Sequence, residues 1–440
     1  MILAPFKVAG QYSHKESEMV ILYDIYGNEY PVSDTDATEP TMKDIPKLFF
    51  YGTLPTSKDD GDLPFRIEYR SLTNEWNGYA TLKVQGNTSA SFPKKNFTLK
   101  LYSDSAMSKK MKVQFKDWGK QNKYVIKANW IDIMHCRNVV GARLWTQIQQ
   151  TRISSLPEKL QQAPRLGAVD GFPIKVYVNG IYQGRYSLNI PKDKWTFNMD
   201  DELNTNVALC GESNEPNTPS VFAVSSDNID GTYWSDEIHD EAPTEVISAF
   251  NRVLKFVNEC TDSEFIANVS NYIDLGSLID YWIFHVCAGN TDAYGKNQLW
   301  LTYDLTHWFI SSYDMDQFWG LNALGVLAYA PDSDHPIIVA QRNKLIKKLI
   351  KNFGSEITAR YTVLRQSILS EGNIIAEIEK WIDICPPELV KEDYAVTTAG
   401  GAFTEIPTKD DENNVQQLRA WVKNRLALMD TLVPNFGVEV

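Results

Sequence analysis

The residues best suited to chemistry lie in two short stretches of the second half of the chain. Four residues separate Asp292 from Asn297 in NTDAYGKN, and one residue separates Asp314 from Asp316 in SSYDMDQFWG. Carboxylate and amide oxygens bind Mg²⁺ well, and a carboxylate can also accept a proton from a hydroxyl group. The pattern fits phosphoryl transfer, in which one acid orients the acceptor and other groups hold the metal against the phosphates.

The same residue types also have a purely structural explanation. Asp and Asn are common in turns, where their side chains bond to nearby backbone, and taken alone Asp292 and Asn297 are explained better by a turn. For Asp314 and Asp316 the functional explanation is favoured instead. Two carboxylates at the end of an aromatic strand repel each other, so a cation is expected beside them.

The elements around these residues are expected to bring them together. An apolar helix should end near residue 290, and residues 297–316 read as two strands joined by a turn. Antiparallel pairing returns the end of the second strand to the start of the first. We therefore expect one cluster at that end of the hairpin: Asp292, Asn297, Asp314 and Asp316.

Over the whole chain, β patterns precede helical ones. Alternating apolar and polar residues predict strands between residues 47 and 130, and FPIKVYVNGIYQGRYSLNI reads as a hairpin turned at Asn-Gly. After about residue 242 the spacing becomes helical, and later helices are expected at about 338–353, 355–370, 373–384 and 412–433. This order predicts an α+β protein with two lobes that meet at a cleft.

We divide the chain of 440 residues into three parts. These are a short N-terminal β segment and linker (1–45), a β-rich N-lobe (46–242) and a mainly helical C-lobe that holds the acidic hairpin (243–440).

Charge and composition narrow the range of partners. A formal net charge of −13 disfavours nucleic acid and favours metal cations, neutral molecules or a basic protein. Aromatic residues make up 12% of the chain, which is common in proteins that bind glycans. The sequence contains no run of eighteen apolar residues, so no transmembrane segment is predicted. The five cysteines form no C-x-x-C pair and the six histidines are scattered, which disfavours a zinc site.

Five motifs in order resemble those of the CotH kinase family, the spore-coat-type atypical protein kinases. They are VQGNTSASFPKKNFTLKLY, KYVIKANWIDIMHCRNVVGARLW, VYVNGIYQGRYSL, NTDAYGKNQLWLTYD and SSYDMDQFWG. The resemblance runs from about Lys47 to about Pro434. It implies a two-lobed, atypical protein-kinase-like fold, ATP and Mg²⁺ or Mn²⁺ as cofactors, and a secreted or cell-surface location reached with a leader that this sequence lacks.

The resemblance also implies a role for each cluster residue. Asp292 would be the catalytic carboxylate, and Asn297, with one or both of Asp314 and Asp316, would hold the metal. The nucleotide phosphates would be touched by Lys95 or Lys127.

Arg137 and Lys94 are two further cations within these motifs. Arg137 lies near a helix start, an unfavourable place for a cation, so it requires an anionic partner: a nearby acid or a phosphate of the nucleotide. We interpret Lys94 instead as a surface lysine whose stem lies over the sheet.

One departure from the family pattern leaves the activity open. Ile190 stands where the family often carries a Glu, and Asp193 could replace that acid only if the loop bends back. The first hypothesis is a protein kinase that phosphorylates Ser or Thr of an extracytoplasmic protein. The alternative is a weak or inactive pseudokinase that binds glycan or protein at the cell surface. A metal-dependent hydrolase is disfavoured, because neither acidic stretch contains a histidine.

Overall fold

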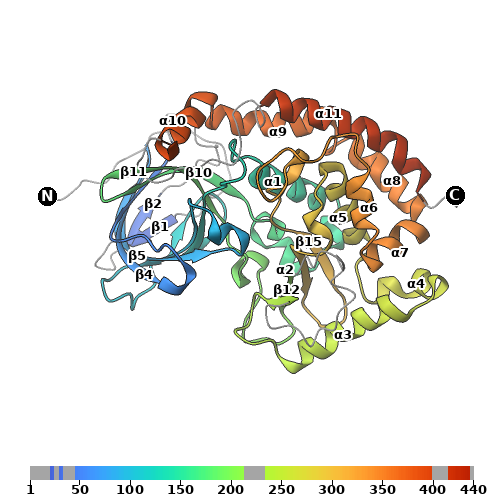
Figure 1. Cartoon of the computed structure of the whole chain (residues 1–440). Helices are drawn as coiled ribbons and strands as arrows, with labels where there is room; N and C mark the ends of the chain where they lie inside the picture. Colours follow the sequence, from blue (N-terminus) through green and yellow to red (C-terminus); the bar gives the residue numbers. More distant parts are fainter. Residues whose placement is uncertain (1–19, 24–28, 33–44, 213–232, 399–414, 437–440) are drawn as a thin grey trace, which may run out of the picture.

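The chain is of the mixed α+β class, with a β-rich N-terminal region and a helical C-terminal region, as the sequence predicts. The computed structural model describes residues 20–23, 29–32, 45–212, 233–398 and 415–436. Figure 1 shows the β-rich region in blue and green on one side and the helices on the other. The strand pair expected near the N-terminus is confirmed, since β1 (Val20–Tyr23) pairs antiparallel with β2 (Glu29–Val32).

The β-rich region is built around a closed barrel. Its strands, in the order of pairing, are β10 (Gly171–Val178), β11 (Ile181–Asn189), β9 (Lys123–Lys127), β6 (Asn96–Tyr102), β5 (Glu75–Gln85), β4 (Leu63–Arg70) and β3 (Lys47–Tyr51). Alternate apolar residues of these strands, such as Leu48, Leu82 and Leu188, fill the interior. Barrel closure depends on the parallel pairing of β10 with β3, a contact that no local pattern predicts.

The Asn-Gly hairpin is present where the sequence predicts it. Asn179 and Gly180 connect β10 to β11 with φ values of 49° and 82°. A two-residue turn with both central residues at positive φ matches the twist of the flanking strands. The hairpin thereby places β11 beside β9, one wall of the site described below.

A four-stranded sheet carries the acidic hairpin. In the order of pairing, its strands are β13 (Trp234–Asp236), β12 (Val207–Gly211), β14 (Gln298–Thr302) and β15 (Phe309–Ser312). The predicted antiparallel pairing of the last two strands is confirmed, with Gln298 opposite Ser312. Two buried helices, α1 (Arg137–Gln150) and α5 (Leu275–Ala288), form the core next to this sheet.

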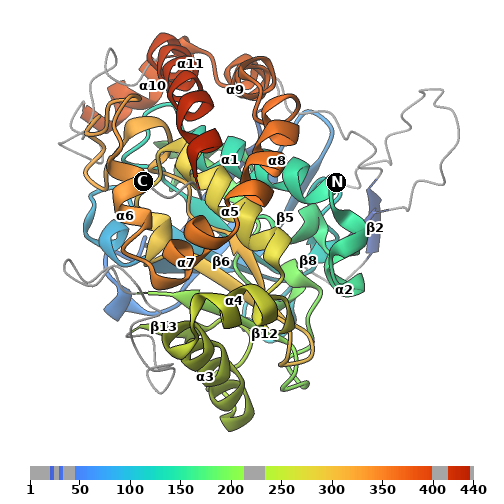
Figure 2. The same cartoon turned by 90° about the vertical axis from the view of Figure 1, so that its right-hand side faces the viewer.

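The remaining helices enclose that core. They are α2 (Glu158–Gln161), α3 (Thr244–Glu259), α4 (Asp262–Asn268), α6 (His335–Ala340), α7 (Lys344–Asn352), α8 (Gly354–Arg365), α9 (Glu371–Ile384), α10 (Pro387–Thr398) and α11 (Val415–Leu432). Short strands β7 (Val113–Gln114) and β8 (Lys120–Gln121) pair with each other. Figure 2 shows α9 and α11 together at one end of the molecule, with α10 beside them.

Two helix predictions need correction. The segment expected as one helix at 338–353 is two, because Asn343 caps α7: its side chain accepts hydrogen bonds from the backbone N–H groups of Leu345 and Ile346. Helix α10 was not expected at all, and it turns out to pack against β11 of the barrel.

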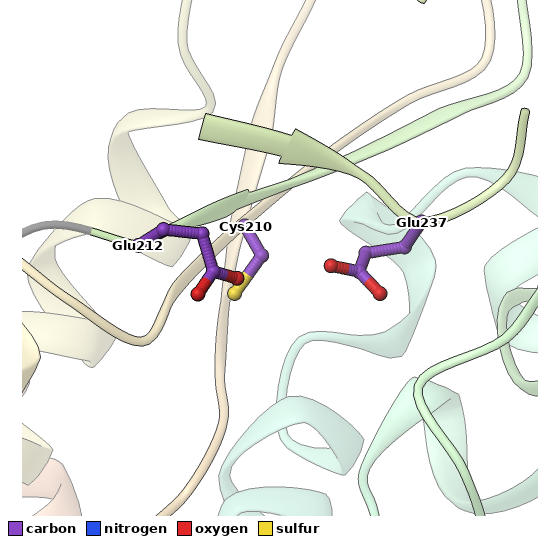
Figure 3. Close-up of side chains that lie close together, drawn as sticks. All are labelled: Cys210, Glu212 and Glu237. Atoms are coloured by element: carbon purple, nitrogen blue, oxygen red, sulfur yellow. The ribbon is translucent and has the colours of Figure 1, made fainter. Parts of the chain in front are cut away.

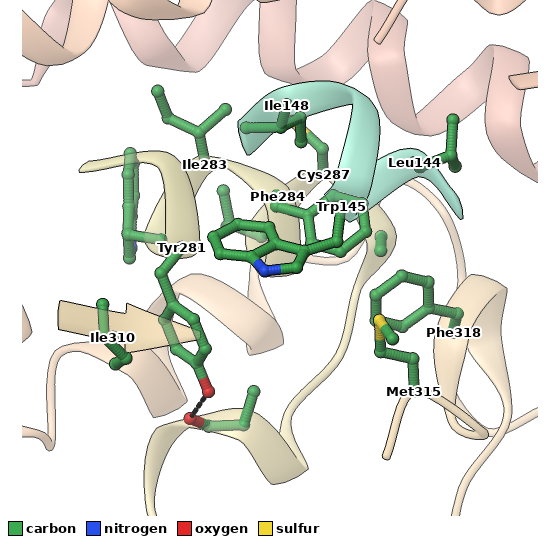
Figure 4. Close-up of a cluster of buried hydrophobic side chains, with 14 of the residues drawn as sticks. Leu144, Trp145, Ile148, Tyr281, Ile283, Phe284, Cys287, Ile310, Met315 and Phe318 are labelled. Atoms are coloured by element: carbon green, nitrogen blue, oxygen red, sulfur yellow. Dashed lines mark hydrogen bonds between the residues drawn. The ribbon is translucent and has the colours of Figure 1, made fainter. Parts of the chain in front are cut away.

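The core beneath the acidic hairpin fixes its backbone. Trp145 of α1 and Phe284 of α5 pack at its centre with their rings tilted by 31°, and Met315 and Phe318 lie beside them (Figure 4). The hydroxyl group of Tyr281 donates a hydrogen bond of 2.7 Å to the carbonyl oxygen of Ala293, next to Asp292. Tight packing below therefore limits the movement of the residues above.

Candidate functional site

The four residues of the predicted acidic cluster lie around one cavity. Asp292, Asn297, Asp314 and Asp316 all line this cavity, which has a volume of about 470 Å³. The opposite wall comes from the barrel region, including the end of β5, residues 86–89 after it, and the end of β9. The cavity therefore lies where the barrel meets the acidic hairpin, and both parts of the chain contribute polar groups to it.

Asp292 and Asn297 are joined directly. The side-chain nitrogen of Asn297 donates a hydrogen bond of 2.6 Å to Oδ2 of Asp292. The backbone N–H of Asp292 donates to Oδ1 of Asn290, and that of Asn297 donates to the carbonyl oxygen of Gly211 on β12. Both residues thus have the turn contacts of the structural explanation, yet their side chains still face the cavity.

Two cluster residues adopt a backbone conformation that few residue types tolerate. Asn297 has φ 60° and Asp314 has φ 50°. Asn and Asp enter this left-handed region more readily than other residues with a side chain, since their short polar groups bond locally. Residues in such conformations gather at functional sites, where surrounding structure holds them.

Asp314 forms an ion pair with a barrel lysine. Lys127, the last residue of β9, places its Nζ 2.9 Å from Oδ1 of Asp314. Burial raises the pKa of Asp314, but the Lys127 ammonium outweighs it and holds the pKa below its usual value. The same pair raises the pKa of Lys127 despite its burial. Both groups are therefore charged at neutral pH.

Asp316 has the opposite electrostatic environment. Burial raises its pKa well above the usual value, and the negative charges of Asp314 and Asp292 raise it further. Lys127 offsets this only in part. Lys296 and Lys192 also lower the pKa of Asp314, so the cavity holds three carboxylates among several ammonium groups. Together with the Asn297 amide, the carboxylates supply the oxygen ligands that a hard divalent cation such as Mg²⁺ or Mn²⁺ prefers.

The structure exchanges the roles that we expected for the two lysines of the PKK motif, with Lys95 near the nucleotide and Lys94 at the surface. Lys94 is not a surface lysine: it is 3% exposed, and it lines the cavity. Lys95 does not line the cavity, and its Nζ donates to the carbonyl oxygen of Ala90 at 2.8 Å. Both lysines precede β6, so no strand period fixes which of them faces inward; contacts decide, since Lys94 pairs with Asp393 and Lys95 with the carbonyl oxygen of Ala90.

Arg137 is also placed away from the cavity wall. Its side chain is fully buried, and Nη1 lies 2.6 Å from Oδ1 of Asp132. Its Nε donates to the carbonyl oxygen of Phe318 at 2.7 Å. The anionic partner that the helix start requires is thus the nearby acid, Asp132. Arg137 ties the start of α1 to the segment after the acidic hairpin.

Neither Ile190, at the family's Glu position, nor Asp193, the possible replacement, lines the cavity. Ile190 is fully buried in the barrel interior, and Asp193 pairs with Lys123. Neither touches Lys94 or Lys127 in the described part of the chain.

A second acidic group at the cavity edge was not predicted. Cys210, Glu212 and Glu237 bring one ligand atom each within 4.8 Å of one another (Figure 3). Lys192 lies among them, with Nζ 2.6 Å from Glu237 and 3.6 Å from Glu212. Burial lowers the pKa of Lys192, but Cys210 and the glutamates raise it well above its usual value. The lysine already supplies the charge that a metal would bring.

These features are those of a ligand-binding protein with its site between two regions. Lysines and carboxylates face each other across a cavity between a β-barrel and a helical region, a donor set suited to a phosphate-bearing ligand with a divalent cation. A family model described as CotH kinase protein matches residues 82–429, about four fifths of the chain, and the chain belongs to this family. The membership makes it a kinase-like protein. A search of curated proteins found no match to the chain.

The structure adds one finding on membranes. Among the described residues, no helix is both long and apolar enough to cross a bilayer.

Proposed function

We propose that this protein is an atypical protein kinase that transfers a phosphate group from ATP to Ser or Thr of an extracytoplasmic protein, with Mg²⁺ or Mn²⁺. The observation that carries the proposal is the convergence of Asp292, Asn297, Asp314 and Asp316 on one cavity with Lys127. The fold alone would not carry it, because one fold serves many functions.

Each side chain has a role that its geometry supports. Asp314, Asp316 and Asn297 would hold the metal, which when bound supplies positive charge that offsets the negative charge of the phosphates. Lys127 would bind phosphate oxygens, because β9 presents its ammonium to the cavity.

Asp292 is suited to the acceptor hydroxyl. The Asn297 amide donates a hydrogen bond to Oδ2 of Asp292. That hydrogen bond orients the carboxylate, which would accept the proton of a serine or threonine hydroxyl. Most of the rate gain in such transfers comes from positioning and charge, so a rigid carboxylate is an advantage.

The surroundings of the cavity fit the rest of the substrate pair. Phe92 and Trp130 also line it and offer flat apolar surfaces for a nucleotide base. The formal net charge of −13 favours a basic acceptor segment, because opposite charges raise the rate of encounter.

The test combines binding and transfer. ATP binding is measured by calorimetry with Mn²⁺, and transfer by ³²P incorporation into the protein itself and into a basic Ser/Thr peptide. We expect Asp292→Asn to bind ATP within about twofold of the original protein and to lose at least about 100-fold in transfer rate, the usual scale of a general base. Asp332→Asn, an exposed carboxylate outside the cavity, is the matched control and should behave as the original protein.

The outcomes separate the hypotheses. ATP binding without any transfer would support the pseudokinase alternative. Absence of ATP binding at millimolar concentration would reject the kinase and favour the alternative, a pseudokinase that binds glycan or protein at the cell surface.

A further inference from the structure

The cavity lysine Lys94 is held by a residue almost 300 positions away. Its Nζ lies 3.1 Å from Oδ1 of Asp393 on α10 and donates a hydrogen bond of 2.5 Å to the carbonyl oxygen of Arg185 on β11. It also lies 4.4 Å from the ring centre of Tyr186. An ammonium with so many fixed contacts has little freedom, so its position at the cavity wall is set by these partners.

Asp393 reaches Lys94 beside Gly184 of β11. It is 8% exposed, and its Oδ1 also accepts the backbone N–H of Arg185 at 2.7 Å. A Cβ atom on Gly184, the residue before Arg185, would lie 2.3 Å from that same Oδ1 and 3.1 Å from Nζ of Lys94. Gly184 also has φ +94°, which favours glycine. The second glycine of the Asn-Gly-x-Tyr-x-Gly-x-Tyr motif therefore admits the carboxylate of α10 into the barrel wall.

The buried charges around Asp393 do not balance. Lys94 and Arg185 are both buried, and Asp393 is the carboxylate that contacts them. His135 approaches the other carboxylate oxygen at 3.5 Å, but burial keeps the pKa of this histidine well below its usual value, so it is neutral. Two cations against one anion leave net positive charge at the barrel side of the cavity. An anionic ligand in the cavity would compensate it.

Among the described residues, no acidic side chain of the barrel pairs with Lys94. Ile190, at the family's Glu position, is apolar and lies in the barrel interior, and Lys127 has its own partner, Asp314. The acid for Lys94 comes from the C-terminal region instead.

We propose that Asp393 is a positioning residue that holds the Lys94 ammonium at the cavity wall for the phosphates of the nucleotide, so that docking of α10 on the barrel completes the nucleotide site. The inference rests on the proposed function, since it names a further part of the same site. It assigns to Asp393 no contact with substrate.

The test uses the full chain and MnATP as the probe. Asp393→Asn keeps the shape and removes the charge, and we expect it to weaken ATP binding about tenfold, the scale of one charged hydrogen bond. Lys94→Gln should weaken binding by the same factor. The double variant should be no weaker than Lys94→Gln, because Asp393 acts only through Lys94.

The matched control lies on the same helix. Glu392 pairs with Lys175 of β10 at 3.0 Å and does not contact Lys94. Glu392→Gln removes one ion pair between α10 and the barrel, and ATP binding should stay within about twofold of the original protein.

A pH series gives a readout that loss of packing alone would not change. Burial and the charge of Arg185 lower the pKa of Lys94, and Asp393 opposes both. A lysine is charged below its pKa, so ATP affinity of Asp393→Asn should fall as pH rises, over a range where the original protein is constant. The groups that face Lys94 are Arg185 and Tyr186 of β11, His135 before α1 and Asp393 of α10.

Each outcome decides the question. The inference is overturned if Asp393→Asn binds ATP like the original protein while Lys94→Gln does not, or if the two losses multiply in the double variant. If Asp393→Asn does not fold, Asp393→Glu retains the charge and should bind within a few fold of the original protein; a loss as large as that of Lys94→Gln contradicts the inference. Absence of ATP binding by the original protein and by Glu392→Gln would instead remove the proposed function, and this inference with it.

Discussion

At the scale of single residues, contact with the cavity, rather than burial, separates the cations that hold the fold from those that could bind a ligand. Arg137 is fully buried and pairs with Asp132, whereas Lys94 and Lys127 line the cavity. Removing Arg137 leaves the Asp132 charge buried with its partner gone, which costs about 3–5 kcal/mol. We therefore expect Arg137→Met to lower the free energy of unfolding by roughly this amount, measured by urea titration, with ATP affinity of the folded protein unchanged.

A second variant distinguishes a loss of folding stability from a loss of ATP binding. Adding Asp132→Asn to Arg137→Met should restore part of the stability, because the buried charge is then removed from both sides. A variant that keeps its stability but loses ATP affinity would return Arg137 to the nucleotide site.

The residues that could be predicted are those that depend on neighbours in the sequence. Asp292, Asn297, Asp314 and Asp316 lie at the ends of two strands whose period and turn are local, so their convergence followed from the pattern. Lys94 could not be placed in this way. Its burial depends on Asp393, which is 299 residues away, and no local period reports such a contact.

At the scale of elements, the connection from α5 to the acidic hairpin is held by a buried neutral histidine. His285 of α5 lies 3.0 Å from Oγ of Ser312 and 3.2 Å from Nδ2 of Asn290. An amide nitrogen can only donate, so the hydrogen-bond network makes Nδ1 the acceptor and leaves Nε2 to donate to Ser312. Burial lowers the pKa of His285 from 6.5 to about 3.

This shift predicts how stability depends on pH. The pKa of His285 is lower folded than unfolded, so the unfolded chain binds the proton first as pH falls. The free energy of unfolding should therefore decrease below about pH 6.5, by about 1.4 kcal/mol per pH unit from this group, until about pH 3. His285→Gln should show a shallower slope between pH 6 and pH 4 in urea titrations at each pH. Equal slopes in both proteins would show that His285 does not titrate as described.

The elements themselves were predicted unevenly, for physical reasons. Barrel strands alternate apolar and polar residues because one face fills the interior, and this pattern is visible in the sequence. Helix α10 ends in threonines and has a weak apolar face. It is positioned by an ion pair with β10 and a hydrogen bond from the backbone of β11. Contacts between distant elements, rather than local preference, decide its place. Closure of the barrel by β3 and β10 is another contact of this kind.

At the scale of the whole molecule, the cavity joins regions with separate hydrophobic cores. The barrel interior forms one core, and α1, α5 and the surrounding helices form another. Lys94 and Lys127 reach the cavity from the first region, and Asp292 and Asp314 from the second. A ligand that contacts both walls must stabilise the two regions together, since it binds the folded arrangement and not the unfolded chain.

Metal and nucleotide should therefore stabilise the protein more together than the sum of their separate effects. The metal alone reduces repulsion among Asp292, Asp314 and Asp316, and ATP alone meets those carboxylates without a neutralising cation. At 100 times its Kd, MgATP should raise the free energy of unfolding by about 2.7 kcal/mol, visible as an increase of a few degrees in Tm. Differential scanning calorimetry with Mg²⁺ alone, ATP with EDTA, and both ligands measures the three shifts. Asp316→Asn should lose the combined gain, whereas additive shifts would mean that metal and nucleotide do not share the cavity.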